Sequence, residues 1–175
     1  MTRLKFNKFV NYDDGKMACT ETTGPFHIPL NIFIDNSEDY PSDYKQRHCF
    51  VDISGIGINI EIFENENDYL SANKIMDIIS LIPTGTMPEL CDDEDSEESP
   101  HILFSGKVID IIWRKSSKES EANLCILVET LEILFKLYLH WNGKIEKGYI
   151  VQGYAWLFGN ILFEDSKEEA YTNPH

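Results

Sequence analysis

Apolar and polar residues alternate most clearly in the second half of the chain. Every odd position from 133 to 141 is apolar, and a period of two indicates a strand with one buried face. Residues 101–113, 124–130 and 148–163 are also rich in β-branched and aromatic residues, which favours strands. Asn142-Gly143 is a hairpin turn signal. The second half therefore predicts four strands, the last of them long and kinked at its glycines.

The first half has shorter strand signals. Residues 3–10 and 26–34 predict two strands, and Pro29 places the second at a sheet edge or delays its start, because proline cannot donate a ladder hydrogen bond. Residues 48–53 and 58–63 predict the arms of a hairpin. The Ser54-Gly55-Ile56-Gly57 sequence between them permits a tight or bulged connection.

One helix is predicted over residues 68–80. Asn67 or Asp68 is a suitable N-cap, because its side-chain oxygen can accept a free backbone N–H of the first turn. Apolar residues then recur at helical spacing from Ala72 to Ile79, and Pro83 ends the pattern. The helix is short, so we expect it to be stable only when packed on the sheet.

Together these elements predict an α+β, mostly β fold: an antiparallel curled sheet or small barrel with one packed helix. The strand number and glycine placement of the second half are similar to an OB-type barrel, an analogy of fold only. The length of 175 residues suits one domain. We expect this domain to cover residues 1–163, with an N-terminal part (1–88), an acidic loop (89–99) and a C-terminal part (100–163), followed by a polar tail (164–175).

Charge narrows the choice of partner. Thirty acidic residues face 15 basic ones, giving a formal net charge of −15. Affinity for nucleic acid comes largely from lysine and arginine neutralising phosphates, so nucleic acid is disfavoured as a direct partner. A protein with a basic surface is the better expectation, although acidity can also serve solubility alone.

The four cysteines match no zinc module, since none forms a CxxC pair. No segment approaches the apolar length of a membrane span, and the N-terminus lacks the apolar run of a signal peptide. We therefore expect reduced thiols in a cytoplasmic protein without a membrane partner. Cys125 lies in an apolar stretch and is expected to be a buried small hydrophobe.

Residues 89–98 form a dense acidic run. Like charges at this density repel, so we expect an extended or disordered segment. The run lacks the spacing and the glycine of a calcium loop, so no metal site is predicted. It is either a solvated linker or a line of carboxylates that mimics phosphates in a basic groove of a partner. Its seven acids are Glu89, Asp92, Asp93, Glu94, Asp95, Glu97 and Glu98.

Two aromatic groups are further candidates. Tyr154, Trp156 and Phe158 share one face of the last strand. The simplest interpretation places that face in the core, and an exposed face would instead supply aromatic anchors for a protein partner. Lys107, Trp113, Arg114 and Lys115 form a small basic and aromatic patch. The patch is either a solvated loop or a site for nucleic acid or another anionic ligand.

No stretch carries a catalytic or cofactor signature, so no cofactor is predicted. A carboxylate-dependent enzyme would need acids such as Asp52, Glu61, Asp110 and Glu129 to converge in one pocket.

The sequence favours a non-enzymatic acidic binding protein. Its profile is typical of inhibitors and immunity-type proteins that cover the basic surface of a nuclease or another nucleic-acid-binding enzyme. The OB-like barrel that binds an anion and the carboxylate enzyme remain as alternatives.

Overall fold

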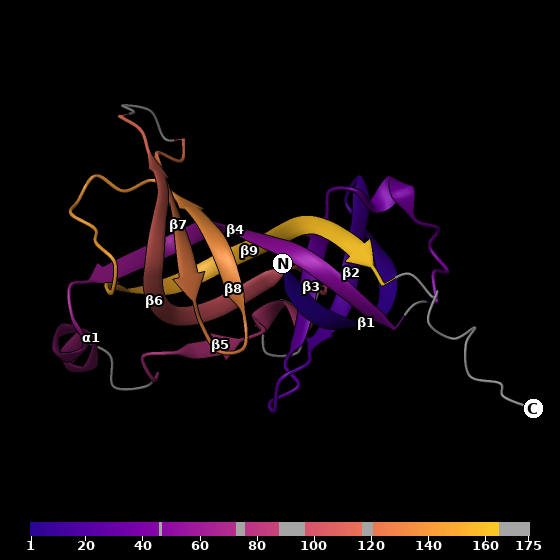
Figure 1. Cartoon of the computed structure of the whole chain (residues 1–175), viewed down its shortest axis with the longest axis horizontal. Helices are drawn as coiled ribbons and strands as arrows, with labels where there is room; N and C mark the ends of the chain where they lie inside the picture. The colour runs from indigo at the N-terminus through magenta and orange to yellow at the C-terminus, as the bar shows by residue number, and fades with distance from the viewer. Residues whose placement is uncertain (46, 73–75, 88–96, 117–120, 165–175) are drawn as a thin grey trace, which may run out of the picture.

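The computed structural model describes residues 1–45, 47–72, 76–87, 97–116 and 121–164, and these form one nine-stranded sheet (Figure 1). Eight of its strands close into a ring that is not a regular barrel. The predicted curled, mostly β fold with one helix is confirmed. In chain order the strands are β1 (Thr2–Tyr12), β2 (Gly15–Thr22), β3 (Pro29–Ile34), β4 (His48–Phe63), β5 (Ser80–Ile82), β6 (His101–Arg114), β7 (Leu124–Glu129), β8 (Leu134–Leu139) and β9 (Ile150–Phe163).

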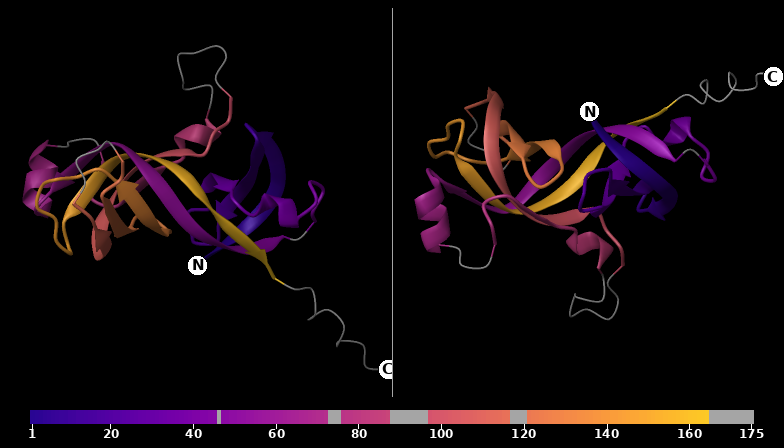
Figure 2. Two further views of the ribbon diagram at one scale, coloured as in Figure 1. Left: turned by 90° about the horizontal axis from the view of Figure 1, so that it is seen from above. Right: turned by 60° about the horizontal axis from the view of Figure 1, so that its bottom comes forward.

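A long antiparallel ladder of β4 and β9 crosses this ring (Figure 2). It divides the ring into two closed circuits that share both strands. The first circuit is β1-β2-β3-β9-β4, closed by the pairing of β1 with β4. The second circuit is β4-β8-β7-β6-β9, closed by the pairing of β6 with β9. Each circuit contains one parallel pair of strands. The pair is β3 with β9 in the first circuit and β4 with β8 in the second.

A closed circuit of five strands with a single parallel pair is also the pairing pattern of an OB-type barrel. Strand β9 serves both circuits because it changes neighbour along its length. Its residues Ile150–Trp156 pair with β6, and Phe158 and Gly159 pair with β3. The likeness to the OB type therefore rests on pairing order.

One continuous core fills the interior of both circuits. Odd-numbered residues of β9 point into it, among them Val151, Leu157 and Ile161, all almost fully buried. From Gln152 onward, the even-numbered residues of β9 point outward and are more exposed. Since side chains alternate along a strand, the sheet has an inner apolar face and a separate outer face.

Two of the predicted turns are wrong. Residues 48–63 form the single strand β4, because this stretch runs unbroken beside β9 along the ladder. Asn142-Gly143 does not join a hairpin either. Strand β4 lies between β8 and β9, so the two strands flanking this loop are not neighbours in the sheet.

Helix α1 (Glu66–Ala72) is shorter than predicted and begins earlier. The cap is Asn65, whose side-chain oxygen accepts from the backbone N–H of Asp68 at 2.9 Å. The hydroxyl of buried Tyr69 donates to the carbonyls of Met76 and Asp77, in a segment that is not helical. The chain then enters β5, which pairs with β6 instead of extending the helix.

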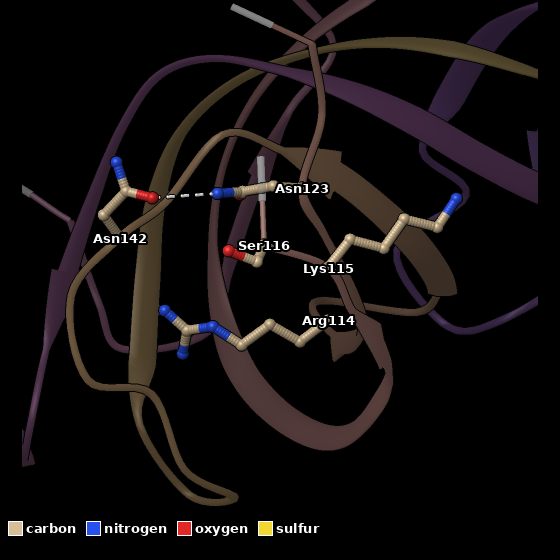
Figure 3. Close-up of a pocket in the computed structure, with 5 residues that line it drawn as sticks. All are labelled: Arg114, Lys115, Ser116, Asn123 and Asn142. Atoms are coloured by element: carbon tan, nitrogen blue, oxygen red, sulfur yellow. Dashed lines mark hydrogen bonds between the residues drawn. The ribbon is translucent and has the colours of Figure 1, made fainter. Parts of the chain in front are cut away.

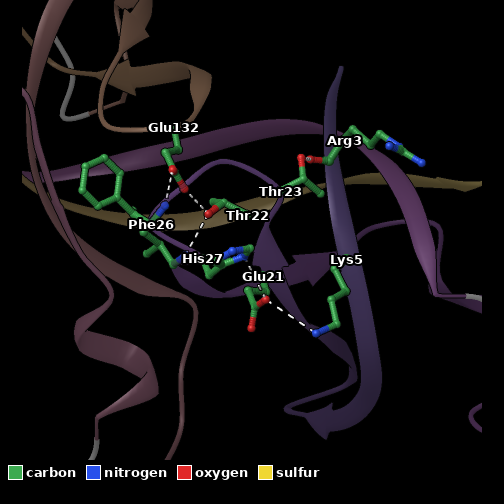
Figure 4. A network of polar contacts seen from close by, with 9 residues as sticks. Arg3, Lys5, Glu21, Thr22, Thr23, Phe26, His27 and Glu132 are labelled. Carbon is green, nitrogen blue, oxygen red and sulfur yellow. Dashed lines mark hydrogen bonds and ion pairs between the residues drawn. The ribbon is translucent and has the colours of Figure 1, made fainter.

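Glu132 connects the two circuits (Figure 4). It lies in the turn between β7 and β8, and its carboxylate accepts from the Thr22 hydroxyl and from the backbone N–H of Phe26 at 2.7 Å. Thr22 is the last residue of β2, and Phe26 lies in the connection between β2 and β3, so both belong to the first circuit. Glu132 has a positive φ of 64°, which is uncommon for a residue other than glycine.

Candidate functional site

Five aromatic side chains cross the outer face of the sheet in a continuous row, which we call the aromatic band. Each of these rings is partly exposed. The members come from four strands, so no single segment of sequence contains the band. In spatial order they are Phe33 of β3, Trp156 and Phe158 of β9, Tyr138 of β8 and Trp113 of β6.

Neighbouring rings of the band are in contact. The centroids of Phe33 and Trp156 are 5.3 Å apart, and the remaining steps along the row measure 6.0 to 6.1 Å. All four pairs are tilted, with interplanar angles of 31° to 53°, and their centroid distances are in the range that aromatic pairs favour.

Small residues on the intervening strands allow these contacts. Ser54 of β4 lies opposite Phe158, between the strands that carry Phe158 and Tyr138. Cys125 of β7 lies opposite both Trp113 and Tyr138, so those two rings meet above it. Cys125 is fully buried, as predicted. Burial raises the pKa of its thiol, which keeps it neutral.

Exposed aliphatic side chains widen the band. Ile56 of β4, opposite Trp156, is 49% exposed, and Ile58 lies opposite Tyr154. Tyr154 itself is 41% exposed. The interpretation that placed Tyr154, Trp156 and Phe158 in the core is wrong, because the odd-numbered residues of β9 fill the core instead. Both faces of this strand are apolar, so composition alone did not show which one is buried.

Phe33 and Tyr138 belong to the band but were not singled out from the sequence. Tyr138 stands on the polar face of the most regular alternating segment, between Leu137 and Leu139. An aromatic residue on the polar side of a strand is a usable signal for an exposed anchor. Phe33 gives a weaker signal, because Asn31 is the one polar residue of its strand.

The acidic run begins and ends beside this band. Residues 88–96 lie outside the described residues, and Glu97 and Glu98 are exposed. A hydrogen bond joins the two residues that flank the run: the backbone N–H of Ser99 donates to the carbonyl of Gly85 at 2.9 Å. A side chain at Gly85 would meet the Ser99 backbone, so this close approach requires glycine. The run therefore leaves and rejoins the fold at one place.

That place adjoins both Phe33 and Trp156. Gly85 accepts from the side chain of Asn31, which is two residues before Phe33 on the same face of β3. Pro100 accepts from the backbone N–H of Leu157 at 2.7 Å, and His101 lies opposite Trp156. Burial lowers the pKa of His101, which favours its neutral form. The residues between which the acidic run is inserted and the aromatic anchors are far apart in sequence but are thus neighbours in space.

The predicted basic patch is divided in the structure. Lys107 pairs with Glu66 of α1 at 2.8 Å, far along β6 from Trp113. Lys115 lies over the Trp113 ring, with its ammonium nitrogen 4.7 Å from the centroid, and so joins the end of the band. Arg114 lines a hollow of about 390 Å³ with Ser116, Asn123 and Asn142 (Figure 3). Its guanidinium donates to two loop carbonyls, those of Trp141 and Gly143.

The four carboxylates considered for an enzyme do not come together. Asp52 pairs with Lys136 at 2.8 Å, a hydrogen bond that raises the pKa of Lys136. Asp110 pairs with Lys147, whose hydrogen bond lowers the pKa of that carboxyl. Glu61 and Glu129 are exposed on different strands. None of the four lines the Arg114 hollow. Within the described part of the chain, no three His, Cys, Asp or Glu side chains are placed to hold a metal ion.

Comparison with known proteins finds no matching family model, no similar curated protein and no similar solved structure. Among the described residues, no helix is long and apolar enough to cross a membrane.

Proposed function

We propose that this chain is a non-enzymatic binding protein that covers a basic surface of a partner protein. The aromatic band would supply the apolar anchor, and the acidic run would complement the partner's charge. One observation carries the proposal: the band adjoins the point where the acidic run leaves and rejoins the fold. Aromatic anchors surrounded by matching charge are the usual make-up of an energetically strong protein interface.

The charge of the fold itself supports a basic partner. The described residues include 21 acidic and 12 basic side chains, a formal net charge of −9 without most of the acidic run. Such a field would steer a cationic surface toward the band and make association fast and sensitive to salt. We place the partner among nucleic-acid-binding enzymes such as nucleases, whose basic grooves suit an acidic inhibitor or immunity-type protein. A cytoplasmic setting is part of this proposal.

The experiment is affinity capture on the immobilised full chain at low salt. We expect a basic protein to be retained and then released as the salt concentration rises, because screening weakens the attraction. Trp156→Ala should no longer retain that protein, whereas Leu162→Ala should retain it. Leu162 is the matched control, since it is 52% exposed on the same outer face of β9 but outside the band. Circular dichroism checks that both variants are folded.

Equal retention by the wild type and Trp156→Ala would contradict a role for the band. A captured protein that is acidic, or whose retention does not depend on salt, would contradict the electrostatic part.

A second function, binding of single-stranded nucleic acid, is favoured by one contact. Lys115 and Trp113 lie together at one end of the band, and a cation beside an aromatic ring suits a nucleotide. The net negative charge of −15 opposes it, because affinity for nucleic acid comes largely from cations that neutralise phosphates. Titration with a 20-nucleotide oligothymidylate at low salt tests nucleic-acid binding. We expect the tryptophan fluorescence to stay unchanged. Quenching would favour nucleic acid over protein as the partner.

A further inference from the structure

The aromatic band carries opposite charges at its two ends. At the first end, the Phe33 ring lies against Gly15, where an added Cβ would be 2.6 Å from the ring carbon Cζ. Gly15 belongs to the lining of a hollow of about 400 Å³ that also contains three carboxylates, Asp13, Asp14 and Glu38, and one cation, Lys16. None of these three carboxylates forms an ion pair within the described residues. With three carboxylates against one lysine, this end carries an excess of negative charge.

The second end is positive. Lys115 lies over Trp113, and Arg114 precedes it at the end of β6. In the described part of the chain neither cation pairs with a carboxylate, whereas six other lysine and arginine residues do. Of the residues that line the adjoining hollow, none is acidic. On a strongly acidic molecule, this is a place where an anionic group would be accepted.

Near the middle of the band lies a hydroxyl group that has no hydrogen-bond partner among the described residues. Ser54 is only 6% exposed and is on the outer face, opposite Phe158 on one side and Lys136 on the other. Its Oγ has no hydrogen bond to any described residue and is not sealed from the surface. The adjacent Asp52 and Lys136 neutralise each other. A hydroxyl that reaches solvent but bonds to no described residue can exchange its water for a hydrogen-bonding group of a ligand.

Resting on the proposed function, we infer that the band accepts one segment of the partner in a single direction. A basic side chain would lie at the Phe33 end, an acidic side chain at the Trp113 end, and a hydrogen-bonding group over Ser54. The band crosses from β3 to β6 over five interstrand steps of about 4.8 Å, or about 24 Å along the curved surface, which an extended segment of about seven residues would span. Charges of the segment that complement the two ends of the band would fix its register, which the uniform apolar contact between them would leave undefined.

A displayed library of random 16-residue peptides, selected on the immobilised full chain, tests this direction. We expect enriched peptides to share a central apolar cluster, a basic residue on one side and an acidic residue on the other. The best peptide should bind Lys115→Glu at least tenfold more weakly by fluorescence anisotropy. Replacing the acidic residue of that peptide by lysine should restore the affinity for Lys115→Glu. Lys8→Glu, a charge reversal at an exposed lysine of β1, a strand that carries no member of the band, is the control.

Ser54→Ala should weaken the same peptide several-fold, because it removes the hydroxyl without adding bulk. The possible outcomes distinguish the proposed function from the proposed direction of binding. If no peptide is enriched, or if Trp156→Ala selects the same peptides, the band is not a protein-binding surface and both proposals fail. If enriched peptides bind through the band but carry no ordered pair of charges, or if Lys115→Glu binds them unchanged, the proposed surface stands and its direction is refuted.

Discussion

At the scale of single residues, Glu132 makes the contact with the clearest consequence for stability. Its carboxylate accepts from one donor at the end of β2 and one in the β2–β3 connection, and so ties the second circuit to the first. Hydrogen bonds to a charged group contribute more than neutral ones, and leaving donors unsatisfied adds a further cost. We therefore expect Glu132→Ala to lower the free energy of unfolding by about 1–3 kcal/mol. Urea denaturation followed by tryptophan fluorescence measures this.

Glu129→Ala is the control for that measurement. Glu129 is exposed on the adjacent strand and has no side-chain hydrogen bond within the described residues. Its substitution should change stability by less than about 0.5 kcal/mol. Equal effects of the two substitutions would show that the Glu132 contacts contribute nothing specific.

The buried thiol of Cys49 should make the stability of the fold depend on pH. Burial raises the pKa of its thiol to about 12, from a usual value of 9.0. Because the folded-state pKa is raised, the thiol's contribution is complete below the unfolded-state pKa near 9 and is lost as the pH rises toward 12. When the pH rises from 8 to 10.5, the free energy of unfolding should fall by about 2 kcal/mol more in the wild type than in Cys49→Val. Parallel urea titrations at the two pH values test this, and equal losses would contradict the assignment.

At the scale of elements, the β4–β9 ladder is the part of the fold that tolerates least change. Gly159 faces β4 so closely that a side chain would meet the backbone oxygen of Asp52. Backbone cannot yield as a side chain can, so Gly159→Ala should lower the free energy of unfolding by about 3 kcal/mol.

Gly55→Ala on the facing strand is the matched comparison. Its added methyl would be 3.1 Å from the Phe135 ring and 3.2 Å from the Ala155 methyl, contacts that small shifts relieve. We expect a loss of about 1 kcal/mol, measured by the same denaturation. A ranking in the opposite order would mean that the ladder is looser than its geometry implies.

The strands also show which parts of the fold the sequence could predict. The four strands of the second half follow from alternation and composition, and all four are present. Strand β2 was missed because its residues, GKMACTET, alternate weakly. Strand β4 was divided in two because glycines inside a strand resemble a turn. These glycines instead stand where β4 passes close to β8 and β9, a tertiary reason that no local pattern contains.

At the scale of the whole molecule, the two joined circuits could not be read from the sequence. Alternation identifies a strand and its faces but not its neighbours in the sheet. The aromatic band depends on those neighbours, because its five rings come from four strands. Tyr154, Trp156, Phe158, Trp113 and Lys115 were each noticed as candidates. Only the pairing order brings the band together beside the acidic run.

The acidic run gives the last prediction. Replacing its seven carboxylates by their amides, Glu by Gln and Asp by Asn, changes the formal net charge from −15 to −8 without altering length. The Gly85–Ser99 hydrogen bond between its two ends is unaffected, so the free energy of unfolding should stay within about 0.5 kcal/mol. Binding to the basic partner should weaken about tenfold at low salt and depend less on salt concentration, because fewer opposite charges meet. Isothermal titration at two salt concentrations decides the matter: unchanged affinity would make the run a solvated loop and leave the aromatic band as the only contact.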